Sequence, residues 1–85
     1  MIKEKIGFRI KEIRMFQLKI SQDELADKIG WDRSFLSRVE SGKQNITIEN
    51  LNAVCNGLDV SLKDFFKSFE DKIDISLGGN NDEKN

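Results

Sequence analysis

Apolar residues in this 85-residue chain recur three and four positions apart, which is the spacing of one face of an α-helix. The chain contains no proline, and its β-branched residues never alternate with polar residues over the length of a strand. These two features argue against a sheet as the main element and predict an all-α fold.

Cap residues divide this helical pattern into short segments. Ser21 and Glu24 form a capping-box pair at the start of one segment, and Gly30 is a typical residue to end it. Asp32 and Thr47 are candidate N-caps for two further helices. We therefore expect five helices joined by brief connections, at about residues 3–17, 22–29, 33–40, 48–58 and 61–70.

Length and composition indicate one small domain. Apolar residues make up 38% of the chain and charged residues 34%, as in globular proteins. A chain this short buries only about 60% of its unfolded surface, so its core has to be compact and helical or supported by a partner. We place the domain at residues 1–75 and expect the polar residues 76–85 to be a disordered tail.

Charge is unevenly distributed along the chain. Residues 1–45 contain ten Lys or Arg against seven Asp or Glu, whereas residues 46–85 contain four against eight. The whole chain has a net charge of −1, but a binding face needs local positive potential rather than a basic whole. The N-terminal half is therefore compatible with an anionic partner such as nucleic acid.

Composition also disfavours several classes of protein. No apolar run approaches the roughly 20 residues that a membrane span needs, and the N-terminus lacks the features of a signal peptide. The chain has no His or Tyr, and Cys55 lies on an apolar stripe without a base partner. We expect a cytoplasmic protein that is not an enzyme and needs no metal or other cofactor.

The segment from residue 22 to 41 has the spacing of a helix-turn-helix, in which two short helices cross steeply at a tight turn. Six positions agree with this motif at fixed offsets: Leu25, Ala26, Ile29, Gly30, Leu36 and Val39. Helical bundles that do not bind DNA also show such apolar spacing, so the pattern alone leaves both interpretations open.

The residues around this segment resemble the lambda-repressor/Cro-like family of helix-turn-helix regulators, also called the XRE family. Residues 21–26 resemble the start of the family's scaffold helix, and residues 39–43 resemble the end of its recognition helix. Residues 51–66 resemble its fourth and fifth helices. The resemblance covers residues 6–66 and implies a lambda-repressor-like domain that binds double-stranded DNA and regulates transcription.

A narrower resemblance is to the controller proteins of restriction–modification systems. It rests on residues 32–37 and 45–48. Those controllers are short dimeric autoregulators, which suits a chain without an effector domain. The resemblance implies a homodimer on a two-fold symmetric operator, with RNA polymerase as a candidate further partner.

The third expected helix carries the candidate base contacts. In this motif that helix enters the major groove with its N-terminal half against the base edges. Arg33 can pair bidentately with guanine, and its alternative role is that of a solvated arginine at a helix start. Phe35 either contacts a thymine methyl or packs in the core. The candidate base-contacting residues are Arg33, Ser34, Phe35 and Ser37.

Phosphate contacts are expected on both sides of these residues. Gln22 resembles the family's phosphate-contacting glutamine, at a helix start whose free N–H groups favour an anion. The other candidates are Arg38, Lys43, Gln44 and Asn45. The last three could equally form an ordinary polar loop. Such contacts would fix the register on DNA without carrying sequence information.

One acidic residue, Glu40, falls on the expected DNA-facing helix. The resemblance implies that it turns inward and pairs with Arg14 or Arg9. The family usually has a glycine-containing turn between Arg14 and Ser21, but this chain has no glycine there. The first helix therefore either runs longer or ends in a different cap.

The fifth expected helix carries more aromatic surface than a short terminal helix needs for its own packing. We predict that Leu62, Phe66 and Phe69 form an isologous dimer interface, which Ile73 and Ile75 would extend. The alternative is an antitoxin or adaptor of the same fold that binds a partner protein through this end. A module that only binds a partner protein would tolerate the loss of the Arg33 side chain.

Overall fold

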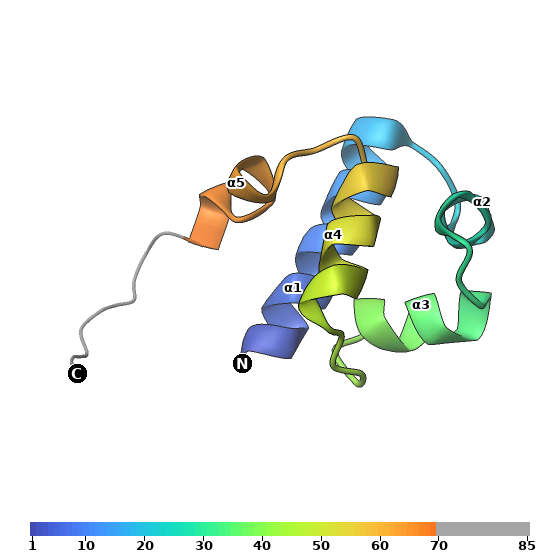
Figure 1. Ribbon diagram of the computed structural model, residues 1–85, viewed down its shortest axis with the longest axis horizontal. Coiled ribbons are helices and arrows are strands. Elements are labelled where there is room, and N and C mark those ends of the chain that lie inside the picture. Colours follow the sequence, from blue (N-terminus) through green and yellow to red (C-terminus); the bar gives the residue numbers. More distant parts are fainter. Residues whose placement is uncertain (70–85) are drawn as a thin grey trace, which may run out of the picture.

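The computed structural model describes residues 1–69, and every regular element in that range is helical (Figure 1). The elements are α1 (Ile2–Glu12), the π-helical turn η1 (Ile13–Leu18), α2 (Gln22–Ile29), α3 (Arg33–Glu40), α4 (Ile48–Gly57), α5 (Leu62–Phe65) and the 3-10 turn η2 (Lys67–Phe69). The expected all-α fold with five helices is confirmed.

The C-terminal end differs from its expected form. α5 has four residues and is followed by η2, so the continuous helix expected at 61–70 is instead two short pieces. The expected tail at 76–85 and the expected contacts of Ile73 and Ile75 lie outside the described residues. Among the described helices, none combines the length and apolar character that crossing a membrane requires.

The first helix ends in a cap that contains no glycine. α1 runs directly into η1, and the turn ends at Lys19, which adopts a left-handed conformation with φ of 58°. The N–H of Ile20 donates to the carbonyl of Arg14 at 3.2 Å, closing a wide turn. Both outcomes expected from the missing glycine are therefore present. The helical segment continues through η1, and it ends at a lysine where glycine is the usual residue.

The two helices of the motif begin and end at the expected residues. Ser21 Oγ accepts the N–H of Glu24 at 3.0 Å, and Glu24 Oε1 accepts the N–H of Ser21 at 2.8 Å. Gly30 closes α2 with φ of 75°, a value that a residue with a Cβ adopts only under strain. Asp32 occupies the N-cap position of α3, but its side chain makes no capping hydrogen bond.

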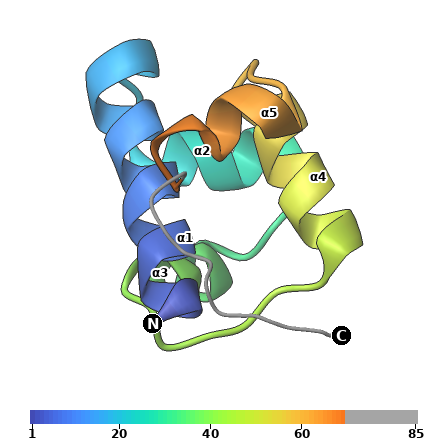
Figure 2. The same ribbon diagram turned by 90° about the vertical axis from the view of Figure 1, so that its left-hand side faces the viewer.

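A single core holds the helices together. α1 packs on α3, α2 packs on both α3 and α4, and α4 packs on α5. Figure 1 shows α2 and α3 at one end of the molecule and α5 at the other, and in Figure 2 α1 and α4 stand on either side of α2. The largest fully buried side chains are Phe65, Ile10, Ile13, Leu25, Leu36, Leu58, Val39, Val54 and Cys55.

Contact between α1 and the end of α3 is made by the backbone itself. Gly7 is buried in the middle of α1, and a Cβ there would collide with the carbonyl oxygen of Val39. The same Cβ would lie 2.8 Å from the carbonyl oxygen of Glu40. The C-terminal end of α3 therefore lies directly against the backbone of α1.

Candidate nucleic-acid interface

The N-terminal half of α3 presents a polar face to solvent. Arg33, Ser34 and Ser37 are exposed, as is Arg38 one residue further on. The opposite face carries the buried residues of the helix, Leu36, Val39 and Glu40. The structure thus brings the polar candidates for base contact together on one accessible surface, as the helical spacing predicts.

The fourth base-contact candidate, Phe35, has a visible packing role. It is half-buried, and its ring meets the Trp31 ring edge-on with 4.8 Å between the centroids. The Arg38 guanidinium carbon lies 5.8 Å from the centroid of the Phe35 ring, within the range of a cation–π contact. The exposed part of Phe35 remains available, and its contact with a thymine methyl stays a prediction.

Arg33 has a partner on the neighbouring helix. Its Nε lies 3.2 Å from Oδ1 of Asp23 on α2, and both side chains are largely exposed. An ion pair this exposed contributes little to stability, so the guanidinium can leave Asp23 for a nucleic-acid group at small cost. The pair places the Arg33 side chain on the side of α3 that faces α2.

The expected phosphate contacts after α3 lie along the connection to α4. Arg38 Nε lies 3.5 Å from Gln44 Oε1, and Gln44 Nε2 donates to the carbonyl of Asn45 at 3.2 Å. Lys43 and Asn45 are exposed and Gln44 is half-buried. These residues form a polar edge that continues from the exposed face of α3, and their roles toward phosphate stay predictions.

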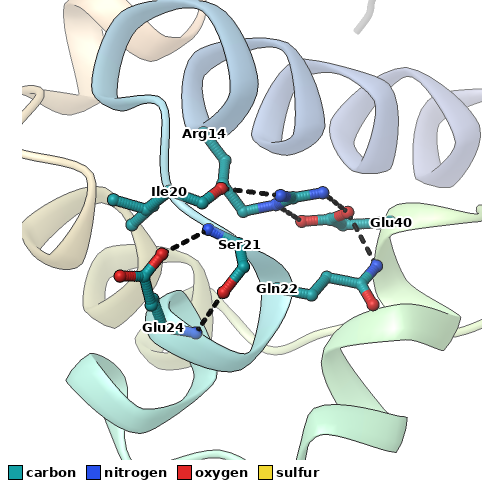
Figure 3. A network of polar contacts seen from close by, with 6 residues as sticks. All are labelled: Arg14, Ile20, Ser21, Gln22, Glu24 and Glu40. Atoms are coloured by element: carbon teal, nitrogen blue, oxygen red, sulfur yellow. Dashed lines mark hydrogen bonds and ion pairs between the residues drawn. The ribbon is translucent and has the colours of Figure 1, made fainter.

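A buried polar network joins η1, α2 and α3 behind the exposed polar face of α3 (Figure 3). Arg14 donates from Nε to Oε2 of Glu40 at 2.7 Å and from Nη2 to Oε1 at 2.9 Å. Its Nη1 donates to the carbonyl of Ile20 at 2.9 Å. Gln22 Nε2 donates to Glu40 Oε1 at 2.9 Å. The inward turn of Glu40 is therefore present in the structure, and Arg14 is its partner.

Arg9, the other arginine proposed for Glu40, has a different role. Its Nε donates to the carbonyl of Phe65 at 2.8 Å and its Nη2 to the carbonyl of Asp64 at 2.9 Å. Nη1 forms an ion pair with Glu12 at 3.0 Å. Arg9 thus ties α1 to the end of α5 and does not pair with Glu40.

Two features of this site were not foreseen from the sequence. The first is the hydrogen bond from Gln22 to Glu40, which holds one side of the Gln22 amide against α3. The second is the close approach at Gly7, for which an isolated glycine inside a helical pattern was an available signal. The hydrogen bond had no comparable signal, because the two residues lie 18 positions apart.

Two short helices at a glycine turn, the second with an exposed polar face, define a helix-turn-helix protein. The helix-turn-helix family profile matches residues 10–65. The control protein C.MunI of a Mycoplasma species is 33% identical over 69 residues, which are 81% of this chain and 93% of that protein. The control protein C.BamHI of Bacillus amyloliquefaciens is 27% identical over 78 residues, covering 92% of this chain and 88% of that protein.

Solved structures show the same likeness. The restriction–modification controller C.Esp1396I, as a tetramer in complex with its natural 35 base-pair operator, matches with a TM-score of 0.74 and 36% identity over 79% of this chain and 87% of that one. The controller C.AhdI from Aeromonas hydrophila matches with a TM-score of 0.71 and 32% identity over 76% and 97%. The chain therefore belongs to the helix-turn-helix family and, within it, to the controller proteins of restriction–modification systems.

Proposed function

We propose that this protein is a sequence-specific transcriptional regulator that binds double-stranded DNA as a homodimer on a two-fold symmetric operator. The observation that carries the proposal is the exposed polar face of α3 on a framework shared with C.Esp1396I, whose solved structure contains its operator. We further propose that the regulated genes include the protein's own gene and those of a restriction–modification system.

In this proposal α3 is the recognition helix. Arg33, Ser34 and Ser37 read base edges in the major groove, and the exposed edge of Phe35 meets a thymine methyl. Phosphate groups on either side are held by residues that fix the register: Gln22, Arg38, Lys43, Gln44 and Asn45. The second N–H of the Gln22 amide is free for this contact because Glu40 uses only one.

The dimer is proposed to form through the end of the molecule opposite α3. Leu62 is 41% exposed, and Phe66 and Phe69 are half-buried. A single recognition helix covers too little DNA for tight specific binding, and pairing two copies through this end would supply a second one. We also propose RNA polymerase as a further partner. Whether the protein activates or represses depends on the position of the operator relative to a promoter.

We propose that the protein acts by binding and not by catalysis, in the cytoplasm where its DNA lies. The one thiol of the chain, Cys55, is buried, and desolvation raises its pKa, which opposes the thiolate form that a nucleophile needs. Among residues 1–69 no three His, Cys, Asp or Glu side chains are grouped to hold a metal ion.

Fluorescence-anisotropy titration with duplex DNA from upstream of the protein's own gene tests the proposal. We expect this duplex to bind about a hundredfold tighter than a scrambled duplex, with affinity that falls steeply as salt rises. Equal, weak binding of both duplexes would reject autoregulation.

The variant Arg33→Ala tests base reading by α3. We expect it to lose about 1–3 kcal/mol of binding free energy on the operator and to lose less on the scrambled duplex. Lys11→Ala is the matched control, because Lys11 is an exposed cation on α1 and lies outside both the proposed DNA-binding residues and the proposed dimer residues. A protein that binds only a protein partner would show no difference between the two variants.

A further inference from the structure

An apolar groove lies between α1 and the last described turn of the chain. It has a volume of about 470 Å³, and its lining comprises Met1, Glu4, Lys5, Phe8, Arg9, Glu12, Ser68 and Phe69. The side chain of Phe8 is 64% exposed and that of Met1 85% exposed. The groove shares no residue with the proposed DNA-binding surface, and Phe69 is the residue it shares with the proposed dimer surface.

We propose that residues 70–77 of the same chain fold back into this groove, so that Ile73 and Ile75 cover it instead of extending the dimer interface. Phe69 lines the groove, so the next residue of the chain starts at its rim. Ile73, Ile75 and Leu77 alternate with polar residues, and an extended segment would place all three on one face. The covalent connection also gives this segment a high effective concentration at the groove, which no separate molecule has.

Length and charge both suit this occupant. An extended segment of eight residues reaches about 26 Å, whereas α1, with 11 residues, is about 16 Å long. α1 carries four cations against two carboxylates: Lys3, Lys5, Arg9 and Lys11 against Glu4 and Glu12. The segment carries three carboxylates against one cation: Glu70, Asp71 and Asp74 against Lys72. The helix as a whole and the segment therefore have net charges of opposite sign, while the side chains that line the groove itself include two cations, Lys5 and Arg9, and two carboxylates, Glu4 and Glu12.

Docking of this segment would remove an otherwise unexplained exposed aromatic side chain from water. Burial of Phe8 under Ile73 and Ile75 would continue the core beyond Phe69, and the polar residues between the isoleucines would face solvent. The groove would thus be completed by the chain itself, and a second copy would not be needed to cover it.

Nuclear Overhauser effects in the full-length protein test the proposal directly. We expect contacts between the methyl groups of Ile73 or Ile75 and the ring of Phe8 in a uniformly ¹³C-labelled sample. A mixture of labelled and unlabelled chains, in which filtered spectra detect only contacts between chains, should not show them. Contacts seen only in the mixture would overturn the proposal in favour of a second copy, and the absence of contacts in both samples would also overturn it.

Limited trypsin cleavage after Lys72 provides a second measurement. We expect the variants Phe8→Asp and Ile75→Ser/Leu77→Ser to be cleaved about fivefold faster at this bond than the wild-type chain, because cleavage follows the population of the open segment. Phe16→Asp is the matched control, since Phe16 is 70% exposed on η1 but lies outside the groove. Unchanged cleavage in Phe8→Asp, with the helical circular dichroism retained, would overturn the proposal.

Discussion

Arg14 and Glu40 are two buried charges that lie together behind the exposed polar face of α3, the proposed recognition helix. Arg14 is 7% exposed and Glu40 6%, yet both carboxylate oxygens and three guanidinium nitrogens have hydrogen-bond partners. Removing two charges from water is costly, and only a complete set of partners offsets that cost. The pair is therefore sensitive to the loss of either member alone.

We predict that Arg14→Met lowers the free energy of unfolding by about 3–5 kcal/mol, because Glu40 would be left buried without its cation. The double variant Arg14→Met/Glu40→Leu should recover most of this loss, because both charges are then absent. Urea unfolding followed by circular dichroism measures both values. A double variant as unstable as the single one would contradict this account.

Lys19 adopts a conformation that suits glycine better. A left-handed conformation costs a residue with a Cβ about 1–2 kcal/mol, and glycine avoids this cost but loses about 0.5–1 kcal/mol of chain entropy on folding. We predict that Lys19→Gly raises the stability by up to about 1 kcal/mol. Thermal unfolding measures the gain, and Lys19→Ala, which keeps the Cβ, should show none.

At the scale of elements, the crossing of α1 over α3 depends on Gly7. Alanine would favour an isolated helix by about 1 kcal/mol, but here its Cβ would overlap the backbone of α3. We predict that Gly7→Ala destabilises the protein by about 1–3 kcal/mol, since two helices have to separate. Lys11→Ala, at an exposed position of the same helix, should be neutral or slightly stabilising, and chemical denaturation compares the two.

At the scale of the whole molecule, α5 and α3 lie at opposite ends (Figure 1). A dimer formed through α5 would therefore leave the proposed recognition helix α3 of each copy exposed. We predict that Leu62→Asp shifts the protein from dimer to monomer in sedimentation velocity at micromolar concentrations. Leu62 is the first residue of α5, where an aspartate is compatible with the helix dipole, so the fold should remain intact. Operator affinity should fall with the loss of the dimer.

Ile48→Asp is the matched control for this experiment. Ile48 is also an exposed apolar side chain at the first residue of a helix, at 77% exposure, but it lies on α4. The Ile48→Asp variant should sediment as the wild-type protein does. A wild-type chain that is monomeric at high micromolar concentration would reject the dimer interface altogether.

Local signals in the sequence were sufficient for the boundaries of the helix-turn-helix. The capping box of Ser21 and Glu24, the glycine at position 30 and the start of α3 after Asp32 are all present in the structure. Each of these features depends on residues within one turn of the helix, so the sequence determines them without knowledge of the fold. The exposed face of α3 follows from helical periodicity in the same way.

Contacts between distant residues were decided only by the tertiary structure. Arg14 and not Arg9 reaches Glu40, Arg9 instead ties α1 to the end of α5, and Gln22 gives one amide hydrogen to Glu40. The tertiary structure also determines the length of α5, because a short helix depends on packing more than on its own helix propensity. Sequence patterns record which face of a helix is apolar, but the partner of a side chain depends on how the helices cross, and crossing is a property of the packed core.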